Sequence, residues 1–255
     1  MLGSCFSDEI GEQMKQRYLH VTCNPFGTLY NPLSIAQAMQ MTDIPELVEH
    51  EGLYHAMSHH GSFSRADRQE AEQAVRASIE TMQQALQEAT VIIVTFGTAW
   101  VYEKDGEIVG NCHKLPESCF TRRRLSVDEI VAAWRPILNR FPDKHWLFTV
   151  SPIRHIRDGL HENQLSKATL LHAVEQIVLH SYPSPATRRY FPSYEIMLDE
   201  LRDYRFYADD LVHPSSLAVN YIWERFVDTF CTPQTKNELV LQHKRWKHEH
   251  HLPLH

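Results

Sequence analysis

Two short stretches near opposite ends of the chain carry side chains that can act together on an acyl group. Ser4 follows a glycine near the start, and Asp210 precedes His213 by three residues near the end. A carboxylate at that spacing can hold Nδ1 of the imidazole and leave Nε2 free as a base. A serine acts as a nucleophile when such a base lies within hydrogen-bond reach. The residue types therefore predict a Ser-His-Asp site if the fold brings the two ends together.

Each of these residues also has a structural interpretation. Serine is a favoured N-cap residue, so Ser4 could simply begin a helix, and His213 could be a structural histidine at a helix N-terminus. Asp209 is a second candidate for the carboxylate, at a spacing of four residues. Cys5 is a second candidate nucleophile, because a thiol at a helix N-terminus can have a lowered pKa. Free cysteines more often pack as small apolar residues, so we prefer Ser4.

The residues between these stretches alternate between strand and helix patterns. Apolar runs at 91–96 and 146–150 show no alternation, which is typical of strands covered on both faces of a parallel sheet. Apolar residues at helical spacing predict helices over 8–18, 32–41, 67–89, 126–141, 164–180 and from 214 onward, with short strands at 19–23 and 190–191. This order predicts an α/β fold with helices on both faces of a mostly parallel sheet. Ligands of such sheets bind beyond the carboxyl ends of the strands, where both candidate stretches would lie.

Several short motifs predict where individual elements begin or turn. Asn31 before Pro32 is typical of an N-cap followed by a first-turn proline. Ser126 with Glu129 three residues later predicts a capping box. The Asp105-Gly106 pair suits a hairpin with a type I′ turn. The basic run 122–124 is interpreted as a solvated turn before a helix rather than an anion site.

Composition argues against several classes of partner. The chain of 255 residues has 25 basic and 32 acidic side chains, a net charge of −7, which disfavours a nucleic-acid surface. No apolar run approaches the roughly 20 residues that a membrane-spanning helix needs. Five cysteines without a CxxC pair favour a reducing compartment, so we expect a cytoplasmic protein with no membrane partner. The oligomeric state is not predicted by these features.

The chain has few groupings that could hold a metal. No Cys/His set with ligand spacing occurs apart from His248-Glu249-His250-His251, which could bind adventitious zinc or nickel. We therefore expect no required metal and no cofactor. These histidines belong to a polar tail, residues 233–255, to which no fold is assigned. Residues 1–232 are expected to form one domain.

A set of short blocks resembles a known family. The segment Gly3-Ser4-Cys5-Phe6-Ser7 is similar to the GSCFA signature, and the chain resembles the GSCFA family of SGNH/GDSL-type hydrolases over most of residues 3–230. The other blocks that fit this resemblance are Asn24-Pro25-Phe26-Gly27, Tyr30-Asn31-Pro32, Phe96 to Tyr102, Asn111-Cys112-His113-Lys114, Ser151 to His155, Tyr190 to Glu195 and Asp210 to Pro214.

The resemblance implies a fold and a catalytic set. The fold would be a flavodoxin-like three-layer α/β/α sandwich of the SGNH hydrolase type. Ser4 would be the nucleophile, His213 the general base and Asp210 the carboxylate that orients it. The amides of Ser4 and Gly27 would form part of the oxyanion hole, the group of donors that stabilises the developing negative charge.

Two features depart from the wider SGNH pattern. Those enzymes carry Gly-x-Asn-Asp after the third strand, where the asparagine donates to the oxyanion, but this chain has Gly97-Thr98-Ala99-Trp100. Asn111 could replace that donor, with His113 or Thr98 as alternatives, although Asn111 could equally be a turn residue. In addition, only Met1 and Leu2 precede Gly3 to build the first strand, so we expect either missing upstream residues or a vestigial strand.

The function implied by the resemblance is that of a serine esterase acting on small acyl esters, such as O-acetyl groups on a carbohydrate. Trp100 and Tyr30 could stack on a sugar ring, with His113 as a further substrate contact, although such aromatic residues often serve packing alone. Two alternatives stay open. One is an acyltransferase that uses the same triad, and the other is a carbohydrate-binding module with a degenerate site.

Overall fold

Four parallel strands form the main sheet in the computed structural model, which describes residues 1–179 and 187–250. Their order across the sheet is β1-β4-β8-β9, and every neighbouring pair runs parallel. The predicted parallel sheet is therefore confirmed, and β4 and β8 lie where the apolar runs placed them. The strands are β1 (Leu2–Gly3), β4 (Val91–Phe96), β8 (His145–Val150) and β9 (Arg188–Phe191).

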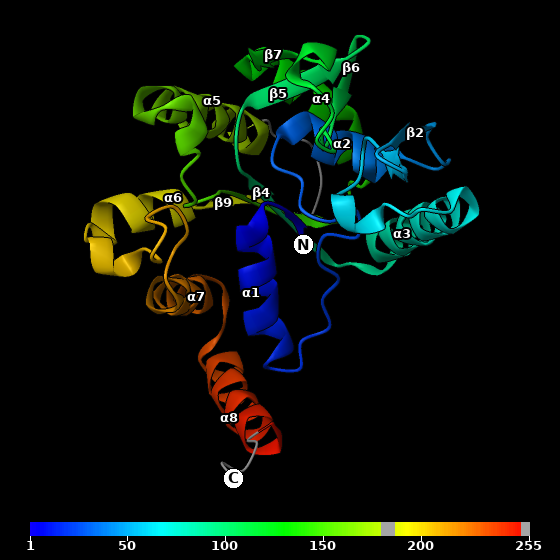
Figure 1. The fold of residues 1–255 in the computed structure, drawn as a ribbon. Helices are drawn as coiled ribbons and strands as arrows, with labels where there is room; N and C mark the ends of the chain where they lie inside the picture. The colour runs from blue at the N-terminus through cyan, green and yellow to red at the C-terminus, as the bar shows by residue number, and fades with distance from the viewer. Residues whose placement is uncertain (180–186, 251–255) are drawn as a thin grey trace.

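Alternate residues of these strands enter two separate hydrophobic cores, because side chains alternate across a strand. Val94 and Phe148 pack in a core shared with α2, α3, α4 and α5, whereas Ile93 and Leu147 pack in a core shared with α1, α7 and α8. Figure 1 shows α1 and α7 on one side of the sheet and α2, α4 and α5 on the other. The mixed α/β arrangement is compatible with a three-layer sandwich. The helices are α1 (Cys5–Lys15), α2 (Pro32–Gln40), α3 (Arg68–Glu88), α4 (Val127–Arg140), α5 (Leu160–Leu179), α6 (Ser193–Glu195), α7 (Ser216–Phe230) and α8 (Pro233–Glu249).

Two small antiparallel sheets lie outside the main one. The first pairs β2 (Leu47–His50) with β3 (Leu53–Ala56), in a region where no strand was predicted. The second has the order β6-β5-β7 and contains β5 (Trp100–Lys104), β6 (Glu107–Val109) and β7 (Thr121–Arg124). The predicted hairpin is confirmed, since Asp105 and Gly106 join β5 to β6 with φ values of 53° and 85°.

The basic run 122–124 is a strand and not the solvated turn that was predicted. Each of its arginines pairs with a carboxylate, because β7 lies beside acidic residues of β5, α4, α5 and the segment before α5. Arg122 pairs with Asp158, Arg123 with Glu103 and Glu129 at 2.8 and 2.6 Å, and Arg124 with Glu162 at 3.3 Å. The three arginine charges are thus paired with carboxylates within the fold.

The helix ends follow the predicted caps closely. Asn31 accepts a hydrogen bond from the amide of Ser34 at 2.8 Å, and Pro32 is the first residue of α2. The capping box of Ser126 and Glu129 opens α4. The first helix differs, since α1 runs from Cys5 to Lys15 and thus begins three residues before the predicted start.

One prediction about a weakly patterned segment was wrong, and a tail without a predicted fold forms a helix. Residues 19–23 are not a strand, although they lie beside β1: the ammonium of Met1 donates to the carbonyl of Thr22 at 2.6 Å. Because β1 has only two residues, it offers too short a ladder for that segment. The tail beyond Thr232 forms helix α8, which Thr232 caps and whose Leu239 is buried in the second core. Its last residues, 251–255, lie outside the described part of the chain.

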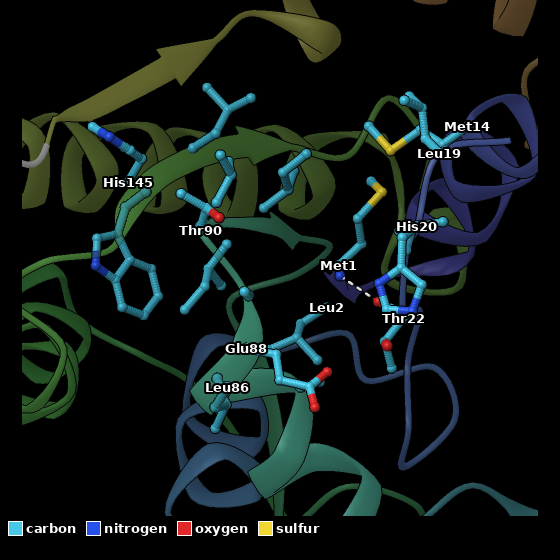
Figure 2. A pocket seen from close by; sticks show the side chains of 18 of the residues that line it. Met1, Leu2, Met14, Leu19, His20, Thr22, Leu86, Glu88, Thr90 and His145 are labelled. Atoms are coloured by element: carbon cyan, nitrogen blue, oxygen red, sulfur yellow. Dashed lines mark hydrogen bonds between the residues drawn. The ribbon is translucent and has the colours of Figure 1, made fainter. Parts of the chain in front are cut away.

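A mostly apolar cavity of about 660 Å³ lies at the amino-terminal ends of the sheet strands. It is lined by Val91 and His145, the first residues of β4 and β8, and by Met1, Met14 and Leu86 (Figure 2). This end of a parallel sheet is opposite to the one at which ligands of such folds bind. A reactive site is therefore expected at the carboxyl ends of the strands.

Candidate active site

The turn that carries Ser4 is held tightly between β1 and α1. Gly3 has a φ of 134°, and a Cβ atom there would lie 2.1 Å from the carbonyl oxygen of Thr95 on β4. Only glycine fits this approach. The amide of Gly3 donates to Asn24 Oδ1 at 2.8 Å, and its carbonyl accepts from the amide of Leu29 at 3.1 Å. The main chain therefore fixes Ser4 against the end of the sheet.

The hydroxyl of Ser4 is buried and has no hydrogen-bond partner among the described residues. Ser4 is the N-cap residue of α1, yet its side chain caps no amide. The N-cap side chains of other helices, such as Asn31, Asp67, Ser126 and Ser215, each accept a hydrogen bond from a main-chain amide. A buried hydroxyl without a partner costs about 1–3 kcal/mol. Capping thus does not explain this serine, which leaves its Oγ available to a ligand.

Asp210 holds His213 in the orientation that the spacing predicted. Nδ1 of His213 lies 2.6 Å from Asp210 Oδ2, and the amides of His213 and Val212 donate to Asp210 Oδ1 at 3.0 and 2.9 Å. These bonds from His213 and Val212 lower the pKa of Asp210 to about 2, so the carboxylate is ionised at neutral pH. Within the described residues Asp210, and not Asp209, bonds to the His213 ring. Nε2 of His213 has no hydrogen-bond partner among the described residues.

Ser4 and His213 line one cavity, although 209 positions separate them in sequence. The cavity has a volume of about 500 Å³ and lies at the carboxyl ends of the strands. No hydrogen bond joins Ser4 to His213 in the residues described. Catalytic hydrogen bonds are often long without substrate and tighten in the complex. The cavity is lined, among others, by Cys5, Tyr30, Asn31, Thr98, Trp100, Tyr102, Asn111, Cys112, Arg122, Ile153, Arg154, His155, Arg157 and Val212.

Two residues that were expected at the site point elsewhere. The amide of Gly27 donates to the carbonyl of Asn24 at 2.7 Å within a turn, so it is not free to donate to an oxyanion, and Gly27 does not line the cavity. The ring of His113 is buried against His55, and its Nε2 lies 3.0 Å from the carbonyl of Ala56. His113 is likewise absent from the cavity lining, because its loop turns back toward β3.

The alternatives for the missing asparagine donor make hydrogen bonds inside the fold. Asn111 lines the cavity, and its Oδ1 accepts from the amide of His113 at 2.8 Å, as a turn residue would; this bond uses its acceptor and leaves Nδ2 as its donor. The Thr98 hydroxyl lies 3.1 Å from Ser166 Oγ and accepts from the amide of Trp100 at 3.1 Å. The Thr98 hydroxyl is therefore bonded within the fold.

The aromatic residues expected to contact substrate do line the cavity. The guanidinium of Arg122 lies over the ring of Trp100, 4.3 Å from its centroid, so one face of this ring is covered. Nε1 of Trp100 is buried and lacks a partner in the described chain. The hydroxyl of Tyr30 lies 3.4 Å from Cys5 Sγ, and burial raises the pKa of Tyr30 to about 12. Tyr30 is thus a neutral wall of the cavity.

Two further residues near the cavity were not assigned a role from sequence. His155 lies on the loop after β8 and lines the cavity, and its Nε2 is buried without a partner in the described residues. Lys167 of α5 is fully buried and donates to the carbonyls of Gly97 and Ser151, each at 2.7 Å. It thereby ties together the ends of β4 and β8. A lysine on the apolar face of a predicted helix was the signal that could have revealed this tie.

Fold and site together define a class: an α/β protein whose parallel sheet presents a serine, a histidine and an aspartate at the carboxyl ends of its strands. The chain belongs to the GSCFA family, whose model matches residues 1–226. Searches among curated proteins and among solved structures found no match. In the described residues no cluster of His, Cys, Asp or Glu is arranged to hold a metal ion, and no helix has the length and apolarity to cross a membrane.

Proposed function

We propose that this protein is a serine ester hydrolase of the SGNH type that acts on small acyl esters. The observation that carries the proposal is the free, buried Oγ of Ser4 on the same cavity as His213, whose ring Asp210 orients. A serine nucleophile needs a base, and the base needs a group that holds its tautomer. Ser4 and His213 line the cavity, and Asp210 bonds to the His213 ring.

In the proposed reaction Ser4 Oγ attacks the carbonyl carbon of the ester and gives its proton to His213 Nε2. The electron pair of the carbonyl moves onto its oxygen, and the N-terminus of α1, which begins directly after Ser4, favours that developing negative charge. His213 then protonates the leaving alcohol, the acyl group stays on Ser4, and water activated by the same imidazole releases it as the acid. Asp210 stays ionised throughout.

The cavity supports a small, polar substrate such as an O-acetylated carbohydrate. Its volume of about 500 Å³ suits a sugar-sized group, and Trp100 and Tyr30 supply flat walls. The unpartnered Nε1 of Trp100 can donate to a hydroxyl or an ester oxygen. Arg122 and Arg157 are paired with Asp158 and Glu117 and add polar edges rather than free charge.

The test is hydrolysis of p-nitrophenyl acetate by the chain and by two neighbouring variants. Ser4→Ala should lose activity about 10⁴-fold or more, whereas Cys5→Ala should stay within about threefold of the unaltered chain. Loss in Cys5→Ala but not in Ser4→Ala would assign the nucleophile to the thiol and overturn the proposal. Faster release of p-nitrophenol with an added alcohol, together with a new ester product, would indicate an acyltransferase. Absence of turnover would favour a binding module.

A further inference from the structure

Buried polar atoms without partners gather at the candidate site. Four such side-chain atoms occur in the described residues, and three of them, Ser4 Oγ, Trp100 Nε1 and His155 Nε2, line the same cavity. The fourth, on His243, lies on α8. An unsatisfied buried polar group is costly, so native proteins keep few of them. The clustering indicates a polar ligand that pairs with all three atoms.

The loop after β8 fixes the position of His155. Its amide donates to Asn163 Oδ1 at 2.9 Å, and the amide of the preceding residue, Arg154, donates to the carbonyl of Val212 at 3.2 Å. The ring of Tyr30 meets the imidazole edge-on, with centroids 5.9 Å apart. The main chain at His155 is therefore held by α5 and by the loop that carries His213, and Tyr30 contacts the ring.

Nε2 of His155 lies over the end of β4. A Cβ atom added to Gly97, the first residue after β4, would be only 3.3 Å from this nitrogen. Two residues earlier, Thr95 pairs with Gly3 in the sheet, and Ser4 follows Gly3 directly. The free ring nitrogen thus stands beside the Ser4 turn, at the strand end where the asparagine of the Gly-x-Asn-Asp pattern is missing.

The surroundings keep the His155 ring neutral. Burial, with smaller contributions from the charges of Lys167 and His213, lowers the pKa of His155 to about 3. A neutral imidazole carries one N–H donor. The other basic groups on the cavity are engaged: Arg122 with Asp158, Arg157 with Glu117, and Arg154 over the ring of Tyr207 at 3.9 Å.

We infer that His155 is a further catalytic residue, which donates a hydrogen bond from Nε2 to the carbonyl oxygen of the bound ester. This inference rests on the proposed function. When Ser4 attacks, the carbonyl electron pair moves onto that oxygen, and the His155 N–H stabilises the new negative charge without transferring its proton. The proton of Ser4 still goes to His213. His155 thereby takes the place of the absent asparagine.

Kinetics on p-nitrophenyl acetate test the inference with three variants. His155→Leu removes the donor and should lower kcat about 10²- to 10³-fold, with KM changed less than about threefold. His155→Gln keeps an N–H group and should recover at least about tenfold of that loss. His161→Leu, an exposed histidine in the first turn of α5, is the matched control and should behave like the unaltered chain. The acidic limb of the pH profile should stay in place, because His155 transfers no proton in the proposed step.

A second measurement determines which nitrogen of the His155 ring carries the proton. In protein labelled with nitrogen-15 at histidine, the signals lost in His155→Gln identify this ring, and they should show a neutral imidazole protonated at Nε2 from pH 5 to 8. A ring protonated at Nδ1 alone, or a charged ring at pH 6, would overturn the inference. So would a fully active His155→Leu variant, or equal losses in Leu and Gln with a shifted acidic limb. An unaltered chain that hydrolyses no ester overturns instead the proposed function on which the inference rests.

Discussion

Ser4 and His213 line the same cavity but are held there in different ways. Ser4 is fully buried, and main-chain hydrogen bonds to β4 and to the loop before α2 hold its turn. The side chain of His213 is 46% exposed and stands on a loop held by Asp210, by Ala208 and by the loop after β8. Leu211 in this loop has a φ of 57°, a conformation that few residues other than glycine adopt. The proposed nucleophile belongs to the core, whereas the proposed base belongs to a surface loop.

This contrast predicts which substitutions should lower the reaction rate without lowering global stability. A side chain that is half exposed and bonded to one partner contributes little to global stability, so its loss should show in the reaction. A residue packed against the sheet contributes both to global stability and to the reaction. The two halves of the site should therefore separate when activity and unfolding are measured on the same variants.

The largest expected effect is that of removing the base. His213→Ala should lower kcat about 10⁴- to 10⁶-fold, because the serine loses its proton acceptor. The free energy of unfolding should change by no more than about 0.5 kcal/mol. Ester hydrolysis and urea denaturation of the same samples check both values. A variant that unfolds early would contradict the view of this loop as separate from the core.

Next in size is the effect of neutralising the carboxylate. Asp210→Asn should lower kcat about 10²- to 10⁴-fold, because an amide no longer selects the tautomer of His213 with a free Nε2. Asp209→Asn is the matched control, since Asp209 makes no bond to that ring, and it should stay within about twofold of the parent. The reverse ranking of the two variants would transfer the orienting role to Asp209.

On the core side, Gly3→Ala should act through folding. Its Cβ would collide with the carbonyl of Thr95 and require an unfavourable φ, so we expect a loss of about 2–4 kcal/mol of stability together with a loss of activity. Gly52→Ala, at a positive φ but with open space around it, should cost only about 1 kcal/mol. Urea midpoints of the two variants measure the difference, and equal midpoints would show that the turn can relax.

The smallest effect is a pH dependence of stability. The pKa of Asp210 is about 2 in the fold against an ordinary value of 3.8, so its contribution is present above about pH 4 and is lost as the pH falls toward 2. The effect should be modest, because the side chain is 49% exposed. Urea midpoints of the chain and of Asp210→Asn should converge between pH 5 and pH 2, and a gap that stays constant would refute the linkage.

Much of the fold could be predicted from sequence because its strongest patterns are local. The apolar runs of β4 and β8, the capping box at Ser126 and the hairpin at Asp105 each depend on neighbouring residues. The predicted strand at 19–23 was wrong for a non-local reason, since a strand there needs a longer partner than β1. Helix α8 was missed because its pattern is mostly polar and only Leu239 is fully buried.

The site residues likewise divide into those set by local sequence and those set by non-local contacts. The bond between Asp210 and His213 spans three residues and follows from the spacing. Gly27 could not be judged from sequence, because its amide is used by a turn whose geometry depends on Asn24. The role proposed for His155 does not follow from its neighbours in sequence, because it depends on β4 and β8 lying side by side, which places its nitrogen over Gly97.

Covalent labelling with a fluorophosphonate, mapped by mass spectrometry, tests the central claim most directly. We predict a single adduct on the hydroxyl of Ser4, absent in Ser4→Ala and present in Cys5→Ala, with labelling slowed strongly in His213→Ala. An adduct at another residue, or no adduct in a chain shown to be folded, would contradict the account of Ser4 as an activated nucleophile.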